Sequence, residues 1–365
     1  MNTTLGVFLL LSVPGVPLLL VLLLLAFPAL NSRLSWVGHI AVLPAIILLA
    51  APEVFSIQVP WLLFGTGLGI DGASRLLLGM SVVLWTVAAS LLHASGQAEN
   101  KRLMSFFLLT MAGNLGTILA TELVGFFTFS TLMSLGFYGL LVDTGNEPAR
   151  WAGRVYLGFM IVADLVLFDV LLITATATGE LCFEAVHHAI LQSSSPGLYL
   201  SIILVGFAAK AGVWPLYFWL PLAFRSSRPA VALLLGGVPI AIALLGAVRW
   251  LPLGEITSPE LGVIIQSLGV AAMLYAILAG LKRAQLKMLP AYVTIIATGL
   301  FTTALGAGLG DSAAWNRYGD LAYFFIASMG GGLALLVIVI GWLETRGHYP
   351  AAPGQETDDS CHWSE

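Results

Sequence analysis

Long apolar runs, separated by short polar or basic breaks, dominate the chain from its first residues. A helix crosses the hydrocarbon core of a bilayer in about 20 residues, and this length predicts eleven membrane-spanning helices. They lie at 5–29, 37–57, 70–93, 103–120, 122–142, 153–177, 198–222, 229–251, 260–281, 287–309 and 318–343. The first run lacks the basic start of a signal peptide, so we expect it to be retained. The pattern predicts an all-α polytopic membrane protein.

Composition supports the same interpretation. Hydrophobic residues make up 59% of the chain and charged residues 9%, and the mean hydropathy is +0.96. Soluble domains carry about 25% charged residues, so this chain has too few charges to cover a water-exposed surface. The net charge of −4 is less informative, because topology depends on where the basic residues lie.

Basic residues alternate between the two predicted sides of the membrane. The breaks after odd-numbered spans hold Arg33, Lys101, Arg102, Arg150, Arg154, Arg225, Arg228, Lys282, Arg283, Lys287 and Arg346. The breaks after even-numbered spans hold only Arg249 and Arg317. Because cytoplasmic loops carry the excess of Lys and Arg, we expect the N-terminus outside and the C-terminus in the cytoplasm of a bacterial inner membrane.

The breaks between spans offer little chemistry of their own. The longest outer loop, 178–197, is compatible with a short amphipathic helix on the membrane surface. Its adjacent His187 and His188 would project in different directions from a helix, which argues against a metal site. Glycine-rich nucleotide loops, clustered CxxC motifs and haem signatures are missing from the sequence. We therefore expect no resident cofactor, no metal, no nucleic-acid partner and no catalytic redox or hydrolytic site.

Five charged residues fall inside predicted spans: Asp71, Arg75, Asp164, Asp169 and Lys210. A charge at the membrane centre costs about 2.5–3.5 kcal/mol on insertion scales, so such residues usually face the bundle interior, pair, or line a water path. Asp71 and Arg75, four residues apart near the outer interface, suggest a structural pair or snorkelling side chains. Asp164 and Asp169 point about 140° apart on one helix, which argues against a shared partner.

Lys210 follows twelve uncharged residues, 198–209, and lies five residues before Pro215. Proline removes one helical hydrogen bond and clashes with the carbonyl four residues earlier, that of Ala211. We expect a broken helix here, with a polar niche beside the lysine. The niche is consistent with two roles that the residues alone do not separate: a lysine that accepts and releases protons, or a fixed ion pair with an aspartate of the preceding span.

The stretch "AAKAGVWPLYFWLP" resembles the hallmark of the antiporter-like membrane subunits of complex I, membrane-bound hydrogenases, multisubunit cation/proton antiporters and inorganic-carbon accumulation complexes. "GIDGASRLLL" and "LKMLPAYVT" resemble two further motifs of this family, in the same order. The resemblance covers roughly residues 68–310. It implies one five-helix repeat over 103–251 after leading helices at 1–100, and a remnant of a second repeat at 260–343. The residues at 344–365 are acidic, and we expect them to form a cytoplasmic tail.

Function in that family rests on a line of buried charges, and this chain keeps only part of it. The resemblance implies proton-transfer roles for Lys210 and Asp164, with Lys287 at the start of the tenth span and Asp169 as further candidates. Elsewhere the charges are replaced. Thr131 stands where the family has a glutamate, Ile161 replaces an arginine, Tyr217 and Leu235 replace histidines, and Ile326 replaces a lysine.

Two functional hypotheses follow. In the first, Lys210 and Asp164 form a switchable pair in a proton-conducting subunit that drives a partner, in inorganic-carbon accumulation with a cytoplasmic zinc protein resembling carbonic anhydrase. In the second, the chain is an antiporter-like or scaffold subunit of a complex I-like or hydrogenase-type redox assembly. A freestanding exchanger is disfavoured, because cation coordination needs clustered oxygen ligands and only isolated carboxylates are present.

Overall fold

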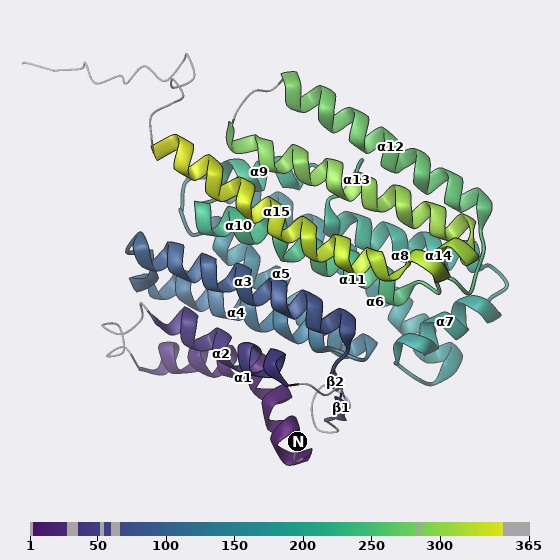
Figure 1. The fold of residues 1–365 in the computed structure, drawn as a ribbon, viewed down its shortest axis with the longest axis horizontal. Helices are drawn as coiled ribbons and strands as arrows, with labels where there is room; N and C mark the ends of the chain where they lie inside the picture. Colours follow the sequence, from purple (N-terminus) through teal and green to yellow (C-terminus); the bar gives the residue numbers. More distant parts are fainter. Residues whose placement is uncertain (1–2, 28–35, 52–54, 60–65, 283–285, 346–365) are drawn as a thin grey trace, which may run out of the picture.

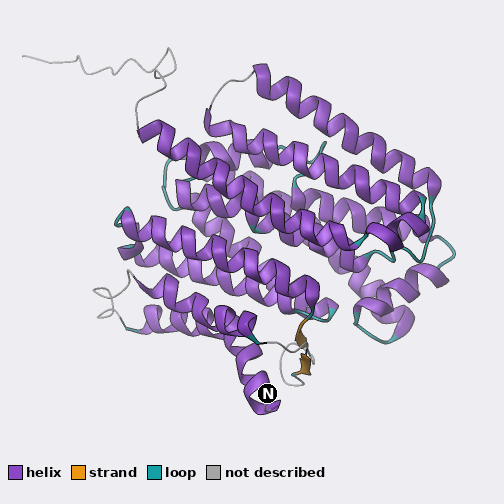
Figure 2. Cartoon of the chain, viewed as in Figure 1, coloured by secondary structure: helices purple, strands orange, loops and turns teal. Residues whose placement is uncertain are grey.

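The computed structural model of the chain describes residues 3–27, 36–51, 55–59, 66–282 and 286–345. Helices make up almost all of this part, and the long ones lie side by side with their axes in roughly one direction (Figures 1 and 2). The predicted all-α polytopic architecture is confirmed. The predicted tail at 344–365 lies almost wholly outside the described residues.

The first half of the chain supplies the leading helices and the helices that surround Lys210. The bounds are α1 Thr3–Ala26, α2 Val37–Ala50, β1 Phe55–Gln58, β2 Gly67–Ile70, α3 Gly72–Ala94, a 3₁₀ turn η2 Gln97–Glu99, α4 Lys101–Leu119, α5 Leu123–Val142, α6 Glu147–Thr178, α7 Phe183–Gln192, α8 Pro196–Ala211 and α9 Trp219–Ser226. The second half contains α10 Pro229–Gly237, α11 Pro239–Trp250, α12 Pro259–Lys282, a 3₁₀ turn η3 Leu286–Met288, α13 Leu289–Gly310, α14 Ser312–Tyr318 and α15 Asp320–Thr345.

All eleven predicted spans have a helical counterpart. Within the described residues, nine helical segments are long and apolar enough to cross a membrane, counting α10 and α11 as one, and α2 and α8 are shorter apolar helices. Two boundaries were wrong: the span predicted at 37–57 ends at Ala50, and the helix predicted over 198–222 stops at Ala211 and resumes only at Trp219. The residues from Phe55 form a strand that pairs with Gly67–Ile70 in an antiparallel hairpin. Hydropathy alone cannot separate a short apolar strand from the end of an apolar helix.

Close helix packing in this bundle depends on small residues, as is common in membranes. A Cβ atom added to Gly113 of α4 would lie 2.4 Å from the backbone nitrogen of Met133 in α5. A Cβ atom added to Gly262 of α12 would lie 2.7 Å from the carbonyl oxygen of Gly306 in α13. Helix α4 therefore contacts α5 backbone to backbone, and α12 contacts α13 in the same way. The first contact fixes the position of α5 near Lys210.

The loop at 178–197 contains the predicted short helix, α7, at the end of the bundle where α14 also lies (Figure 1). His187 in this helix contacts the carbonyl oxygen of Arg249 at 3.1 Å and the carboxylate of Glu255 at 3.4 Å. His188 takes no part in these contacts. Within the described residues, no group of three metal-ligating side chains occurs.

Candidate functional site

Lys210 lies in the last turn of α8, where the helix stops at Ala211. Gly212 follows in the left-handed region with φ of 64°, the conformation that commonly ends a helix and that glycine adopts at little cost. The chain then continues without helix until Trp219. The broken helix predicted near Pro215 is therefore present, but it begins at Gly212, three residues before the proline.

The carbonyl groups released at this break are not left free. The backbone N–H of Val213 donates to the carbonyl of Ala208 at 2.9 Å, and the indole N–H of Trp219 donates to the carbonyl of Ala209 at 3.1 Å. Both bonds supply partners that a helix terminus otherwise lacks. The break holds Lys210 in a fixed place, and its polar partners come from α5 and α6.

The Lys210 ammonium group is buried and contacts two side chains at short distance. Its Nζ lies 2.6 Å from Oδ1 of Asp164 on α6 and donates to the Ser130 hydroxyl on α5 at 2.7 Å. The Lys210 side chain is 5% exposed and the Asp164 side chain 13%. A charged pair at this depth is stable only when both members keep their partners.

Thr131 completes the arrangement from the same helix as Ser130. Its hydroxyl donates to Oδ2 of Asp164 at 3.1 Å, the oxygen that does not face Lys210. Thr131 is the residue that stands where the resembled motif has a glutamate. The position is therefore still in contact with the pair, with a neutral donor in place of a second carboxylate. Sequence reasoning missed Ser130 and named Thr131 only as the residue in the glutamate's position, because serine and threonine are common in membrane helices and give no periodic signal.

The two other candidate residues lie apart from this pair. Asp169, five residues beyond Asp164, is exposed on the opposite side of α6 from the bundle interior. Lys287 is exposed in the 3₁₀ turn before α13, beside a cavity of about 90 Å³ lined also by Ser227 of the α9–α10 connection. The structure thus brings together Lys210 and Asp164, and it does not bring Asp169 or Lys287 to them.

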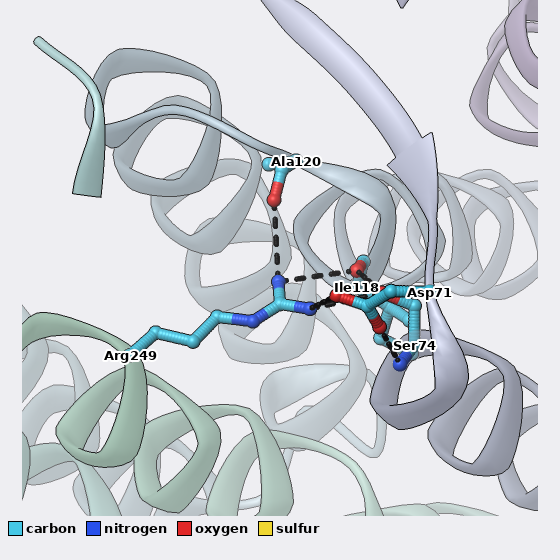
Figure 3. A network of polar contacts seen from close by, with 5 residues as sticks. All are labelled: Asp71, Ser74, Ile118, Ala120 and Arg249. Carbon is cyan, nitrogen blue, oxygen red and sulfur yellow. Dashed lines mark hydrogen bonds and ion pairs between the residues drawn. The ribbon is translucent and has the colours of Figure 1, made fainter. Parts of the chain in front are cut away.

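A second polar cluster lies at the end of the bundle near α7, and it was not predicted (Figure 3). The Arg249 guanidinium group, 10% exposed, donates to the carbonyls of Ile118 and Ala120 at 3.3 and 3.2 Å and to the Ser74 hydroxyl at 2.9 Å. It also lies 3.7 Å from the Asp71 carboxylate. Carbonyls at a helix end attract cations, so Arg249 joins the end of α4 to α3 and α11.

This cluster corrects the interpretation of Asp71 and Arg75 as a pair. The Asp71 carboxylate accepts from the backbone N–H of Ser74 at 2.6 Å, which caps α3, and its other oxygen faces Arg249. The Arg75 guanidinium donates to the carbonyl of Ala51 at 2.6 Å. Four-residue spacing on a helix permits a contact between Asp71 and Arg75. Here the Asp71 carboxylate caps the helix and points away from the helix face.

The second half of the bundle is much poorer in buried charge. In the described part of α12 to α15 the buried polar side chains are Thr294, Thr298 and Thr302, and each hydroxyl donates to a carbonyl of its own helix. Leu235 and Ile326 are fully buried. The Tyr217 hydroxyl donates to the hydroxyl of Tyr275 on α12. The described residues of α12 to α15 therefore contain no buried lysine or histidine that would continue the line of charges found in the resembled family.

The fold and the site together define a polytopic helical membrane protein with a buried lysine–carboxylate pair beside a broken helix. Residues 120–345 match the family model described as "NADH:quinone oxidoreductase/Mrp antiporter, TM". Because the match covers more than half of the chain, the chain belongs to this family.

Curated relatives come from several kinds of membrane complex. The chain is 35% identical over 175 residues to a probable K(+)/H(+) antiporter component of Rhizobium meliloti, covering 46% of this chain and 32% of the relative. It is 26% identical over 260 residues to "NADH-quinone oxidoreductase subunit M" of Pseudomonas aeruginosa, covering 66% and 50%. With "Hydrogenase-4 component B" of Escherichia coli it shares 24% identity over 241 residues, covering 64% and 35%. The chain thus spans between a third and a half of these relatives.

Solved structures share the fold at low sequence identity. A chain in the structure of the Mrp complex from Dietzia matches with a TM-score of 0.79 and 23% identity, over 94% of this chain and 65% of that one. A chain of an archaeal membrane-bound sulfane sulfur reductase matches with a TM-score of 0.76 and 16% identity, over 93% and 71%. The chain therefore shares its arrangement of helices with a chain of each of these complexes.

Proposed function

We propose that the chain is a proton-conducting subunit of a multi-subunit membrane complex, in which Lys210 and Asp164 form a switchable pair. The observation that carries this proposal is the buried 2.6 Å contact between Lys210 Nζ and Asp164 Oδ1 at the broken end of α8. A pair that served only to tie two helices together could be replaced by packed apolar side chains at little cost in stability. A pair retained at this depth is a functional-site hypothesis by default.

The proposed switch has two arrangements of the same proton. When the ammonium and carboxylate are both charged, they hold each other and Ser130 accepts from the lysine. Transfer of one proton from Lys210 to Asp164 leaves a neutral amine and a neutral carboxyl, and Thr131 can still donate to the carboxyl oxygen. An ion or proton that moves through a neighbouring subunit would shift the equilibrium between the charged and the neutral pair. Charges interact strongly over short distances in a medium of low dielectric constant.

The remaining candidate residues fit this function as ends of a route. Lys287 is an exposed cation on the side of the bundle that we propose to be cytoplasmic, and it would load or release protons there. Asp169, exposed on α6, would meet a partner chain at the surface of the subunit. Since α12 to α15 lack a buried lysine or histidine in the described residues, protons would leave the Lys210 pair through a partner chain.

For the driven partner, we keep two candidates. The sequence-based proposal is a cytoplasmic zinc protein resembling carbonic anhydrase, in a complex that accumulates inorganic carbon. The second candidate is a cation antiporter or redox assembly. The names of the relatives favour it, since they describe an antiporter subunit, a hydrogenase component and a quinone oxidoreductase subunit. Mass spectrometry of proteins that co-purify in mild detergent separates these candidates by the partner found.

Replacement of Lys210 by alanine tests the conducting role. We expect the proton-coupled activity per assembled complex to be lost, with a lower yield of complex because the variant leaves the buried Asp164 carboxylate without its partner. Lys282→Ala provides a matched control, because Lys282 is an exposed lysine at the end of α12. Full proton-coupled activity per assembled complex in Lys210→Ala would instead support a scaffold.

A further inference from the structure

Asp169 is a charged residue on a surface that should face hydrocarbon. It lies nine residues before the end of α6 at Thr178, and its side chain is exposed. Among the described residues, the other exposed charged side chains lie nearer to a helix end or in connections. Asp164, on the same helix, has Lys210 as its partner, whereas Asp169 has no ion pair among the described residues.

The depth of Asp169 follows from helix geometry. With a rise of about 1.5 Å per residue, Asp169 is about 22 Å along the axis from Arg154 and about 14 Å from Thr178, where α6 ends two residues before Glu180. Apart from the buried Asp164, Arg154 and Glu180 are the nearest charged residues of the chain toward the two ends. A hydrocarbon core is about 30 Å thick, so a core placed between Arg154 and Glu180 leaves Asp169 at least about 7 Å below its nearer surface. Lipid headgroups carry their charges outside this zone.

The surroundings of Asp169 are apolar on all sides of the exposed face. Leu165 and Ile173 lie one turn away in each direction, with 61% and 41% of their surfaces exposed, and Phe168 and Leu172 are 40% and 46% exposed. Residues three and four positions apart share a helix face. The face therefore presents one carboxylate ringed by large apolar side chains.

We propose that this face of α6 is an interface for a transmembrane helix of another subunit, which offers a lysine or arginine to Asp169. This inference rests on the proposed role of the chain inside a multi-subunit complex and identifies the contact surface. Charge complementarity favours a basic partner, because an unpaired carboxylate in hydrocarbon is costly and the apolar ring would exclude lipid and water around the pair. A second copy of this chain is disfavoured, since its α6 would bring another carboxylate to the first.

Carboxyl modification by dicyclohexylcarbodiimide tests the interface, because this apolar reagent reacts with carboxyl groups exposed to hydrocarbon. The modified fraction of the Asp169 peptide is measured by mass spectrometry in the intact complex and in the same chain after its partners are removed with a harsher detergent. We expect about tenfold less modification in the complex, the ratio for a contact that is open one tenth of the time. Asp169→Asn locates the label, and the ion-paired Asp164 serves as the internal control that stays unmodified in both samples.

A charge reversal gives the second arm. Asp169→Lys should release the partner subunit, and Asp169→Asn should retain more of the partner than Asp169→Lys does. Changing the partner's lysine to aspartate should restore the complex with Asp169→Lys. The isolated Asp169→Leu chain should unfold no more readily than the unmodified chain, since the residue is exposed.

The outcomes separate this inference from the proposed function. Equal modification of Asp169 with the partner still bound would overturn the interface and leave the conducting role standing. Protection by a second copy of the same chain would overturn the basic-partner assignment. If no other subunit co-purifies, the interface and the proposed role in a complex fall together.

Discussion

Replacement of Lys210 by methionine removes the charge while keeping most of the side-chain volume, and its energetic effect can be worked from the structure. The two charges lie 2.6 Å apart, which gives an attraction of about 6 kcal/mol at an effective dielectric constant of about 20. Burying each ion costs several kcal/mol, so the intact pair is close to neutral for stability. The single variant is different, because it leaves a buried carboxylate without its partner.

Breaking a buried pair on one side typically costs about 3–5 kcal/mol. We expect Lys210→Met to lose about 3–5 kcal/mol of unfolding free energy at pH 7, because it leaves the Asp164 carboxylate buried without its partner.

Equilibrium unfolding in mixed micelles measures this loss, with a double-mutant cycle as control. The variant Lys210→Met/Asp164→Asn removes both charges, and it should lose less than about 2 kcal/mol, since no uncompensated charge remains. A single variant as stable as the unmodified chain at pH 7, or a double variant less stable than both singles, would refute the buried ion pair.

Three further predictions address neighbouring features. Thr131→Glu/Asp164→Asn moves the carboxylate to the position that the resembled motif uses, and because Thr131 already contacts Asp164, proton-coupled activity should exceed that of Asp164→Asn alone in the same membrane assay. Arg249→Gln should lower the unfolding free energy by about 1–3 kcal/mol, because charge-assisted hydrogen bonds are lost. The control Arg317→Gln, at an exposed position, should change it by less than about 0.5 kcal/mol. Equal losses in the two variants would contradict the contacts of Arg249. Gly212→Ala should cost about 1–2 kcal/mol in the same unfolding assay, because its φ of 64° disfavours a residue with a Cβ atom, and an unaffected stability would place the break elsewhere.

Much of the helix arrangement could be predicted because the bilayer imposes a fixed span length. The same rule failed between α2 and α3, where Phe55 and Ile70 pair across a short hairpin whose apolar residues resemble the end of a span. The helix break at Lys210 was predicted from Pro215. Gly212 ends the helix, and nothing in hydropathy distinguishes that glycine from those buried between helices.

The candidate site was predicted in part, for physical reasons that differ from residue to residue. Lys210 and Asp164 stand out because charges are rare in apolar helices. Ser130 carries no such signal, since its role depends on α5 lying beside α8. The basic character of Arg249 predicts a loop position, but the carbonyls that hold it belong to a helix end more than a hundred residues earlier in the chain.

Proton flux through the purified complex in sealed vesicles tests the central claim most directly. A potential imposed with potassium and valinomycin drives protons, and an enclosed pH-sensitive dye reports their movement. The double variant Lys210→Met/Asp164→Asn suits this measurement, because we expect it to fold and assemble without the charged pair. The account predicts flux at the level of protein-free vesicles for this variant and clear flux for the unmodified complex; equal flux from both would contradict it.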